Sequence, residues 1–343
     1  MILLAATVAW ALPFENREKV TLMFWNLENF FDFKDDGTGE SDAEFSATGA
    51  RRWTKARFYR KCQAVAKTIL WAGSEMAGKG SPGSGGVPDV VGMAEVENRF
   101  VLTQLVTKTA LRKLDYKIVH FDSPDARGID CALLYRASRL TLVSAKPCRV
   151  SAPGLQTRDI LLAQFVTEAG DSLVVLVNHH PSKLGGETDW RREVAVARLR
   201  ALGDSLAAAG WPRAVAVGDF NDTPDNPLFT RLSPFFSLCR IKNFGKDSFY
   251  GKGKSFDEED WRTVGSIRFN GEWQLIDLCF VSPALADAAS FSVLEPPFLT
   301  ERDAAHSGDR PLRTYSGPRY LGGVSDHRPI LVRLTLPFIQ TLP

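Results

Sequence analysis

Short apolar runs recur along the chain and predict β-strands, whereas three longer segments carry apolar residues at helical spacing. The strand-like runs lie at residues 20–25, 89–93, 116–121, 131–135, 140–150, 160–167, 173–177, 214–217, 272–281 and 330–336. The helical patterns lie at residues 51–72, 99–114 and 188–209. Because such helices bury one apolar face, we expect them to lie against sheets. The pattern therefore predicts a mixed α/β protein.

Polar side chains stand at the ends of several predicted strands, where the apolar pattern stops. They are Asn26, Glu28, Glu95, His179, Asp219 and Asn221. Asp219 and Asn221 are two residues apart, so in an extended chain both side chains point the same way. Such a pair suits a water and a phosphate oxygen, although residues 222–225 also fit an Asx-rich turn. We favour a functional edge because so many strands end in this way.

The last predicted strand differs from the others because its polar residues come before it. Asp326 and His327 precede residues 330–336. They can join the other polar groups at one edge only if this strand runs antiparallel to the strands that end there. The sheets are therefore predicted to be mixed or largely antiparallel, which excludes a parallel Rossmann arrangement.

Two further residues stand out from the apolar pattern around them. Asp277 lies inside the run at residues 272–281. Burying a carboxylate is costly unless it has a partner, and a histidine is the natural one. His179 stands at the exit of the most apolar strand, where a histidine more often serves a site than a core. Its neighbour His180 is the second choice.

Taken together, these groups indicate metal-assisted phosphate chemistry. Carboxylates and amides without thiolates suit a hard cation, Mg²⁺ or Mn²⁺. Histidines paired with carboxylates can donate to phosphate oxygens or to a leaving group, and Arg158 can clamp a phosphate. The chain contains neither a Gly-x-Ser-x-Gly elbow nor a Walker loop. The predicted reaction is in-line attack of water on a phosphoester.

Composition narrows the class of protein only slightly. The chain has 343 residues and a formal net charge of +2, so general attraction to nucleic acid or membranes is not indicated. Its five cysteines are scattered without a Cys-x-x-Cys pair, which favours buried thiols over disulfides or a metal site. Residues 1–15 are expected to form a signal segment, which favours a periplasmic or secreted protein over a cytoplasmic one. No other stretch is long and apolar enough to cross a membrane.

Six short motifs occur in an order that resembles the endonuclease/exonuclease/phosphatase superfamily, whose members have the DNase I-like fold. They are Trp-Asn-Leu-Glu (25–28), Ala-Glu-Val-Glu (94–97), Asn-His-His-Pro-Ser (178–182), Gly-Asp-Phe-Asn (218–221), Ile-Asp-Leu-Cys-Phe-Val-Ser (276–282) and Ser-Asp-His-Arg-Pro (325–329). Each motif is weak alone, but six in order are specific for the superfamily. The sequence late in the chain is similar to that of exported bacterial members.

This resemblance implies a four-layer α-β-β-α sandwich, with two mostly antiparallel sheets face to face and helices outside. Residues 16–343 are then expected to form one catalytic domain, acting as a monomer. By motif position, Glu95 is implied to be the principal ligand of Mg²⁺ or Mn²⁺. Asn26 and Glu28 are implied to lie nearby, and Asp326 to complete the metal region.

The resemblance also implies roles in the reaction itself. Asp219 would orient or deprotonate the attacking water, and Asn221 would bind the phosphate. Asp277 would pair with His327, which accounts for the carboxylate in an apolar strand. His179 would bind phosphate or protonate the leaving oxygen.

Two further residues are assigned in relation to His179. Arg158 precedes the strand that leads to it, as a phosphate-contacting arginine does in the DNase branch. Asp130 is taken as the carboxylate behind His179. Glu97 departs from the DNase pattern, which has an arginine at that position, and an acid there argues against DNase-like cleavage of DNA.

The substrate is left open among several phosphoesters. A metal-dependent phosphodiesterase is preferred, with nucleic acid slightly favoured because arginines gather at residues 300–319. Phospholipid and sugar-phosphate substrates are the alternatives within the same fold. A dimetal calcineurin-like enzyme is discounted because the chain lacks an Asn-His-Glu run. In another class, a catalytically inactive chain would only bind a phosphorylated ligand or a protein.

Overall fold

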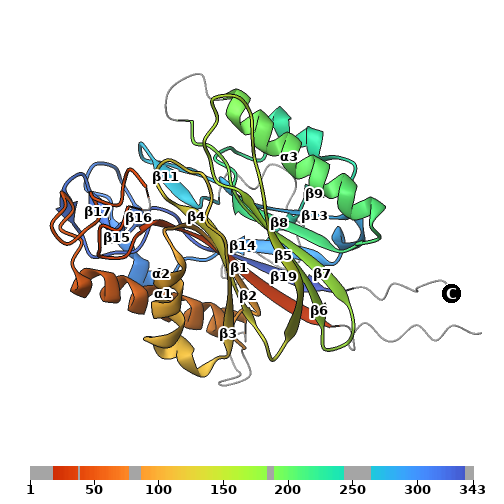
Figure 1. Ribbon diagram of the computed structural model, residues 1–343, viewed down its shortest axis with the longest axis horizontal. Helices are drawn as coiled ribbons and strands as arrows, with labels where there is room; N and C mark the ends of the chain where they lie inside the picture. Colours follow the sequence, from red (N-terminus) through yellow and green to blue (C-terminus); the bar gives the residue numbers. More distant parts are fainter. Residues whose placement is uncertain (1–17, 38, 77–85, 184–188, 243–263, 337–343) are drawn as a thin grey trace, which may run out of the picture.

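The computed structural model describes residues 18–37, 39–76, 86–183, 189–242 and 264–336. The expected signal segment, residues 1–15, lies outside these residues. Two large sheets form the centre of the molecule (Figure 1).

The first sheet has seven strands, and the long strand β1 lies near its middle. In order across the sheet the strands are β10 (Arg240–Ile241), β14 (Ala289–Val293), β19 (Ile330–Thr335), β1 (Lys19–Phe30), β2 (Val90–Val96), β4 (Asp130–Arg136) and β3 (Tyr116–His120). β1 runs parallel to β2 but antiparallel to β19. The predicted direction of the last strand is therefore confirmed, and residues 325–327 reach the edge where β1 and β2 end.

The second sheet has six strands and is also mostly antiparallel. In order they are β5 (Leu140–Cys148), β6 (Ile160–Thr167), β7 (Ser172–His179), β8 (Ala214–Asp219), β13 (Asp277–Val281) and β9 (Ser237–Leu238). Within this sheet β7 and β8 run parallel, which brings His179 opposite Asp219. β13 runs antiparallel to β8 and places Asp277 opposite Asp219 from the other side.

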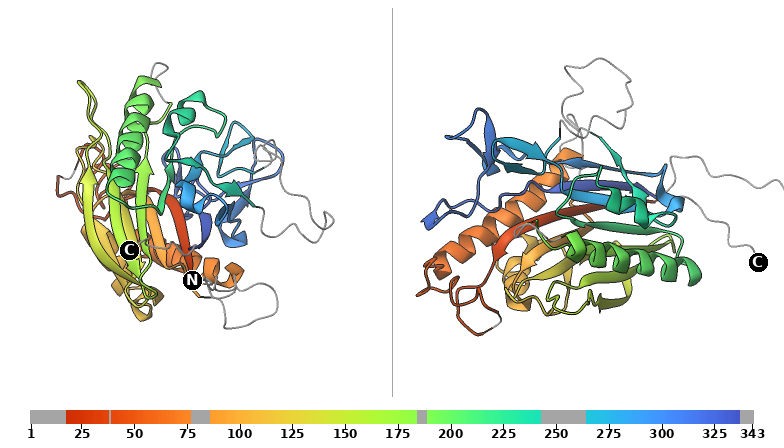
Figure 2. Two further views of the ribbon diagram at one scale, coloured as in Figure 1. Left: turned by 90° about the vertical axis from the view of Figure 1, so that its right-hand side faces the viewer. Right: turned by 90° about the horizontal axis from the view of Figure 1, so that it is seen from above.

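Helices cover the outer faces of the two sheets (Figures 1 and 2). α1 (Lys55–Met76) and α2 (Arg99–Thr107) pack on the first sheet around a core that includes Trp25, Phe58 and Leu105. α3 (Asp189–Ala208) packs on the second sheet, and the two inner sheet faces share one core with it. The expected four-layer α-β-β-α sandwich is confirmed.

Three predicted elements differ in detail from the structure. The run at 272–281 is two strands, because β12 (Glu272–Gln274) pairs with β11 (Ile267–Phe269) in a separate hairpin. The chain turns between β12 and β13, where Ser266 Oγ accepts hydrogen bonds from the N–H groups of Ile276 and Asp277. The helix expected over 99–114 ends at Thr107, and a 3-10 helix, η2 (Ala110–Lys113), follows the cap that Thr109 provides.

The third difference is in residues 300–323, for which the apolar pattern predicts no strand or helix. It forms two short hairpins, β15 (Thr300–Arg302) with β16 (Asp309–Pro311), and β17 (Tyr315–Ser316) with β18 (Arg319–Tyr320). Three more 3-10 helices connect strands: η3 (Pro227–Leu232), η5 (Pro283–Leu285) and η6 (Pro297–Leu299). The hairpins β11–β12, β15–β16 and β17–β18 lie at the same end of the sandwich (Figure 1).

The prediction of buried thiols is confirmed. All five cysteines are buried free thiols. Among the described helices, none combines the length and apolar character needed to span a bilayer.

Candidate active site

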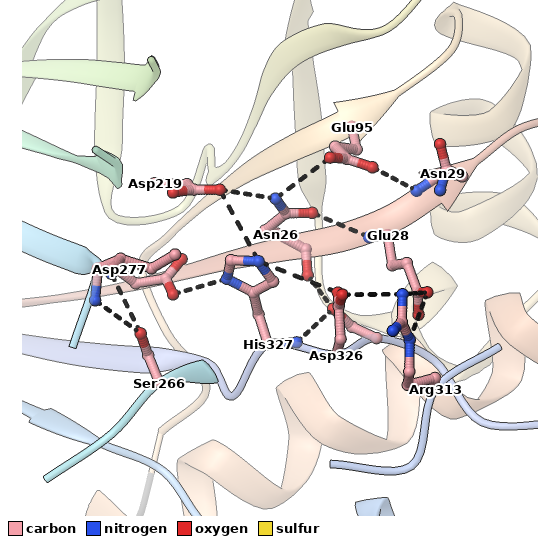
Figure 3. Close-up of polar contacts among 12 residues, drawn as sticks. Asn26, Glu28, Asn29, Glu95, Asp219, Ser266, Asp277, Arg313, Asp326 and His327 are labelled. Atoms are coloured by element: carbon pink, nitrogen blue, oxygen red, sulfur yellow. Dashed lines mark hydrogen bonds and ion pairs between the residues drawn. The ribbon is translucent and has the colours of Figure 1, made fainter. Parts of the chain in front are cut away.

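The polar strand ends gather at one edge of the two facing sheets (Figure 3). Four of the seven non-glycine residues with positive φ in the described chain lie here: Glu28, Asn29, Glu95 and Asn221. Left-handed backbone is unfavourable for such residues and is concentrated at functional sites. At this edge the regular strand pairing is interrupted. The register between β1 and β2 shifts where Glu28 and Asn29 lie, and the register between β2 and β4 shifts where Glu95 lies.

His327 and Asp277 form a buried pair at the centre of the edge. His327 Nδ1 lies 2.7 Å from Asp277 Oδ2, and Asp277 is fully buried. The predicted histidine partner of Asp277 is therefore confirmed. Burial opposes protonation of His327, but the carboxylates of Asp277 and Asp219 outweigh it and hold its pKa well above the usual value. These carboxylates favour the imidazolium form of His327.

Asp219 is the group that the other side chains surround. Its Oδ2 accepts a hydrogen bond from Asn26 Nδ2 at 3.0 Å. It also lies 3.7 Å from His179 Nε2 and 3.8 Å from His327 Nε2. Burial raises the pKa of Asp219 to about 7 despite the positive charge of His327. A carboxylate with such a pKa can take up a proton near neutrality.

Glu95 lies on the other side of Asn26 from the His327 pair. Its Oε2 accepts the backbone N–H of Asn29 at 2.7 Å and lies 3.2 Å from the Arg127 guanidinium. Its Oε1 lies 3.8 Å from His179 Nε2. Burial opposes ionisation of Glu95, but Arg127 and the Asn29 N–H outweigh burial and lower its pKa. Glu95 is thus an ionised carboxylate facing Asp219 and His179.

Glu28 points away from Glu95 toward Arg313. Its Oε1 accepts two hydrogen bonds from the Arg313 guanidinium, and its Oε2 accepts the N–H of Thr314. Asp326 Oδ2 lies 3.0 Å from the same guanidinium, so Arg313 bridges both carboxylates. Burial and the nearby Asp326 raise the pKa of Glu28 to about 7.

Lys61 holds the backbone of Glu28 and the side chain of Thr314 together. It projects from α1 and is buried, although lysine almost never is. Its Nζ donates to the carbonyl of Glu28 at 2.7 Å and to Thr314 Oγ1 at 2.9 Å. Burial lowers the pKa of Lys61 to about 8, against the attraction of the nearby carboxylates. Lys61 therefore ties the left-handed turn of β1 to the segment that carries Arg313.

The two histidines at the end of β7 have different environments. Burial and Arg158 hold the pKa of His179 well below its usual value, so His179 is a neutral imidazole whose Nε2 faces Asp219 and Glu95. His180 packs edge-on against Phe220, and neither of its ring nitrogens has a hydrogen-bond partner in the described chain. His180, the second choice for a functional histidine, is therefore a buried residue that packs in the core.

Three predicted residues have contacts other than those expected. Asn221 has a φ of 52°, so the extended geometry assumed for it and Asp219 is wrong. Its side chain donates to the carbonyl of His180. Arg158 is buried and binds Asp125 at 2.9 Å and the same carbonyl at 2.7 Å.

Asp130 is not the carboxylate behind His179. It lies 3.0 Å from His120 Nε2 instead, and among the described residues His179 Nδ1 has no hydrogen-bond partner. β4 pairs with β3, which carries His120, so Asp130 faces across its own sheet. Glu97 is buried and accepts the N–H of Asp32 at 2.6 Å.

The ligand atoms at this edge suit a hard divalent cation, but the predicted ligands do not all lie together. Ionised Glu95, linked to Asp219 through Asn26, offers oxygen ligands and no thiolate. Among the described residues, however, Glu28, Glu95 and Asp326 do not form one compact group of ligand atoms. Arg313 occupies the space between Glu28 and Asp326. Glu95 is therefore the best placed of the predicted ligands, and Glu28 acts through its contacts with Arg313 and Thr314.

Comparison with protein families gives one extended match. A model described as the Endonuclease/Exonuclease/phosphatase family matches residues 21–336. The chain is also 26% identical to human nocturnin over 157 residues, which is 43% of this chain and 35% of nocturnin. For Xenopus laevis nocturnin the identity is 28% over 160 residues, 43% of this chain and 39% of the relative. The matches span well under half the length of these curated relatives.

Solved structures agree with the fold. The chain is similar to an endonuclease/exonuclease/phosphatase family protein of Bacteroides thetaiotaomicron, with a TM-score of 0.56, 16% identity and coverage of 93% and 98% of the two chains. A mannosyl-6-phosphatase of the same organism gives a TM-score of 0.56 at 15% identity, covering 91% and 98%. The human nocturnin catalytic domain with bound sulfate gives 0.53 at 16%, covering 94% and 98%. At these identities the likeness concerns the fold.

Proposed function

The chain belongs to the endonuclease/exonuclease/phosphatase family, and on that premise we propose that it is a divalent-metal-dependent phosphodiester hydrolase. The observation that carries the proposal is the placement of Asp219 between neutral His179 and protonated His327, near ionised Glu95. A site that only bound phosphate would need positively charged side chains at this edge, whereas carboxylates lie at its centre. Residues 16–343 would act as one catalytic domain.

The cation, Mg²⁺ or Mn²⁺, would be held chiefly by Glu95, with Asn26 and Asp326 at its sides. When bound, it would supply Lewis-acid stabilisation of charge on the phosphoryl oxygens. Arg313 keeps Asp326 and Glu28 oriented. Asn29 and Arg127 hold Glu95 ionised and limit its motion.

Asp219 would orient the attacking water and accept its proton. Asn26 fixes the carboxylate through a 3.0 Å hydrogen bond, and burial sets its pKa near neutrality. Asp219 thus has the position and the proton affinity of a general base.

The two histidines would act on the phosphate in different ways. His327, held protonated by Asp277, offers a charged Nε2–H donor toward developing negative charge. His179 is neutral and would donate one hydrogen bond to a phosphate oxygen. Asn221 and Arg158, whose side chains both bind the carbonyl of His180, would position the end of β7 that carries His179.

Hydrolysis of bis-p-nitrophenyl phosphate and p-nitrophenyl phosphate by the purified chain tests this proposal. We expect release from the diester with Mg²⁺ or Mn²⁺, none with EDTA, and a loss of roughly 10²–10⁴-fold in Asp219→Asn. Asp287→Asn, which alters an exposed aspartate, is the matched control and should keep full activity. Release mainly from the monoester would replace the diesterase with a phosphatase.

A second outcome would favour the inactive binding module. In that case neither ester would be cleaved, and the cation would not bind to the wild-type chain. Nucleic acid is the substrate we favour, and phospholipid and sugar-phosphate esters are the other candidates for the same screen.

A further inference from the structure

A cavity of about 140 Å³ adjoins the proposed reaction centre on the side of Asp326. It lies between the hairpins β11–β12 and β15–β16 and the segment that carries Arg313. The side chains that matter for its chemistry are Arg268, Asn270, His306, Arg310, Arg313 and Asp326, with Asp303 at its wall. Arg313 and Asp326 belong to both the cavity and the reaction centre, so the two are contiguous.

The walls of this cavity are held in place by Arg268. Its guanidinium donates to the carbonyls of Gly271, Ser307 and Asp309, which joins the two hairpins. Gly271 has a φ of +85°, and a Cβ there would come within 2.7 Å of the His306 ring. The hairpins therefore meet without room for a side chain at this turn, and the cavity between them is preformed.

The cavity is rich in hydrogen-bond donors, because three arginines line it. Three guanidinium groups, those of Arg268, Arg310 and Arg313, face two carboxylates, Asp303 and Asp326. Asp303 holds two of these arginines, with its carboxylate 3.7 Å from Arg268 and 3.6 Å from Arg310. Arg310 is also held by Glu301 at 2.8 Å, and Arg313 by Glu28 and Asp326, so each arginine of the cavity is fixed by at least one carboxylate.

We propose that this cavity binds a second, non-scissile phosphate of the substrate, beside the phosphoester that is cleaved. Arginines fixed by carboxylates present their remaining N–H groups in a rigid array, which suits the oxygens of a phosphate. Arg310 is one-third exposed and His306 nearly half, so both can reach a ligand. The inference rests on the proposed function, because it places the substrate's reacting group next to Asp326.

A substrate that carries a second phosphate close to the cleaved one is the class that this arrangement selects. A nucleic-acid strand presents such a pair at every nucleotide, whereas a simple phosphomonoester presents one group only. The cavity thereby distinguishes a nucleotide diester from the small esters that would reveal the basic activity.

Binding of two stable ligands by the full chain with Mg²⁺ tests the proposal. Isothermal titration calorimetry would compare thymidine 3′,5′-bisphosphate with thymidine 5′-monophosphate. We expect the bisphosphate to bind about tenfold more tightly or better in the wild type. This preference should fall close to one in Arg310→Gln and be partly kept in Arg310→Lys.

Arg302→Gln is the matched control, because it removes the same charge from the β15–β16 hairpin but does not line the cavity. It should keep the wild-type preference. If Arg310→Gln does not fold, as judged by thermal unfolding, His306→Ala takes its place with the same expectation. Equal binding of the two ligands by the wild type, or a preference that Arg310→Gln leaves unchanged, would overturn the proposal.

The same experiment separates failure of the cavity from failure of the proposed function. Ligand binding is read without turnover, so a bisphosphate preference in a chain that cleaves no ester would keep the cavity and reject the hydrolase. Metal-dependent cleavage of the small diester without a bisphosphate preference would keep the hydrolase and reject the cavity.

Discussion

The 2.7 Å contact between His327 Nδ1 and Asp277 Oδ2 joins a segment of the first sheet to a strand of the second. Asp277 is fully buried, so its negative charge acts on His327 with little screening by solvent. The contact also fixes which nitrogen of His327 faces Asp219. The position of the proposed phosphate donor therefore depends on Asp277, and its charge depends on Asp277 together with Asp219.

Asp277→Asn should lower kcat for bis-p-nitrophenyl phosphate by roughly 10²–10⁴-fold. The amide keeps the shape of the carboxylate but removes its charge, so the pKa of His327 falls and the ring loses its proton at lower pH. The basic limb of the pH–rate profile should move to lower pH. Asp287→Asn is the control for loss of one aspartate. An unchanged profile in Asp277→Asn would show that His327 does not act as an imidazolium.

Glu95→Gln should weaken binding of Mn²⁺ by at least about 10- to 100-fold, the loss typical even for residues that only support a metal ligand. The reason is that Glu95 is the ionised carboxylate nearest to Asp219 and His179. Calorimetric titration with Mn²⁺ measures the effect without any substrate. Glu272→Gln, on the exposed β12 strand, should bind as the wild type does. Undiminished binding in Glu95→Gln would move the cation to another part of the edge.

Lys61→Met should lower the free energy of unfolding by about 1.5–3 kcal/mol, the value of hydrogen bonds made by a charged group. Methionine fills a similar volume but leaves the Glu28 carbonyl and Thr314 Oγ1 without the ammonium. Urea unfolding followed by circular dichroism measures the change. Lys55→Met, at an exposed position of the same helix, should change stability little. If both variants unfold alike, Lys61 contributes no more than a surface lysine.

The fold could be predicted from the sequence because the spacing of apolar residues indicates the strands and helices and their order along the chain. The antiparallel last strand and the Asp277–His327 pair followed from where polar residues stood relative to apolar runs. These are local features of the sequence, so they can be recognised without knowing how the two sheets pack.

The supporting cations of the site could not be predicted in the same way. Lys61 lies three residues after Phe58 on the inward face of α1, but one lysine among apolar residues does not reveal its partners. Arg127 and Arg313 come from loops whose paths depend on tertiary packing. The assignment of Asp130 to His179 was wrong for a similar reason, because only the pairing of β3 with β4 brings Asp130 close to His120.

His180→Phe should make the protein less sensitive to acid. Burial lowers the pKa of His180 to about 3, well below the ordinary value of 6.5. Below pH 6.5 the unfolded chain therefore takes up a proton that the folded chain does not, and stability present above that pH is lost as pH falls. From this group alone, the wild type should lose about 2 kcal/mol between pH 7.5 and pH 5. Phenylalanine keeps the ring against Phe220 and removes the titration.

Urea unfolding at pH 7.5 and at pH 5 measures this difference, and the variant should lose less stability than the wild type over that interval. His306→Phe is the matched control for loss of one histidine, because its ring is nearly half exposed at the surface. It should follow the wild type between the two pH values. Parallel losses in His180→Phe and the wild type would mean that the buried ring takes up its proton without unfolding, and that the end of β7 can open to solvent while the two sheets stay packed.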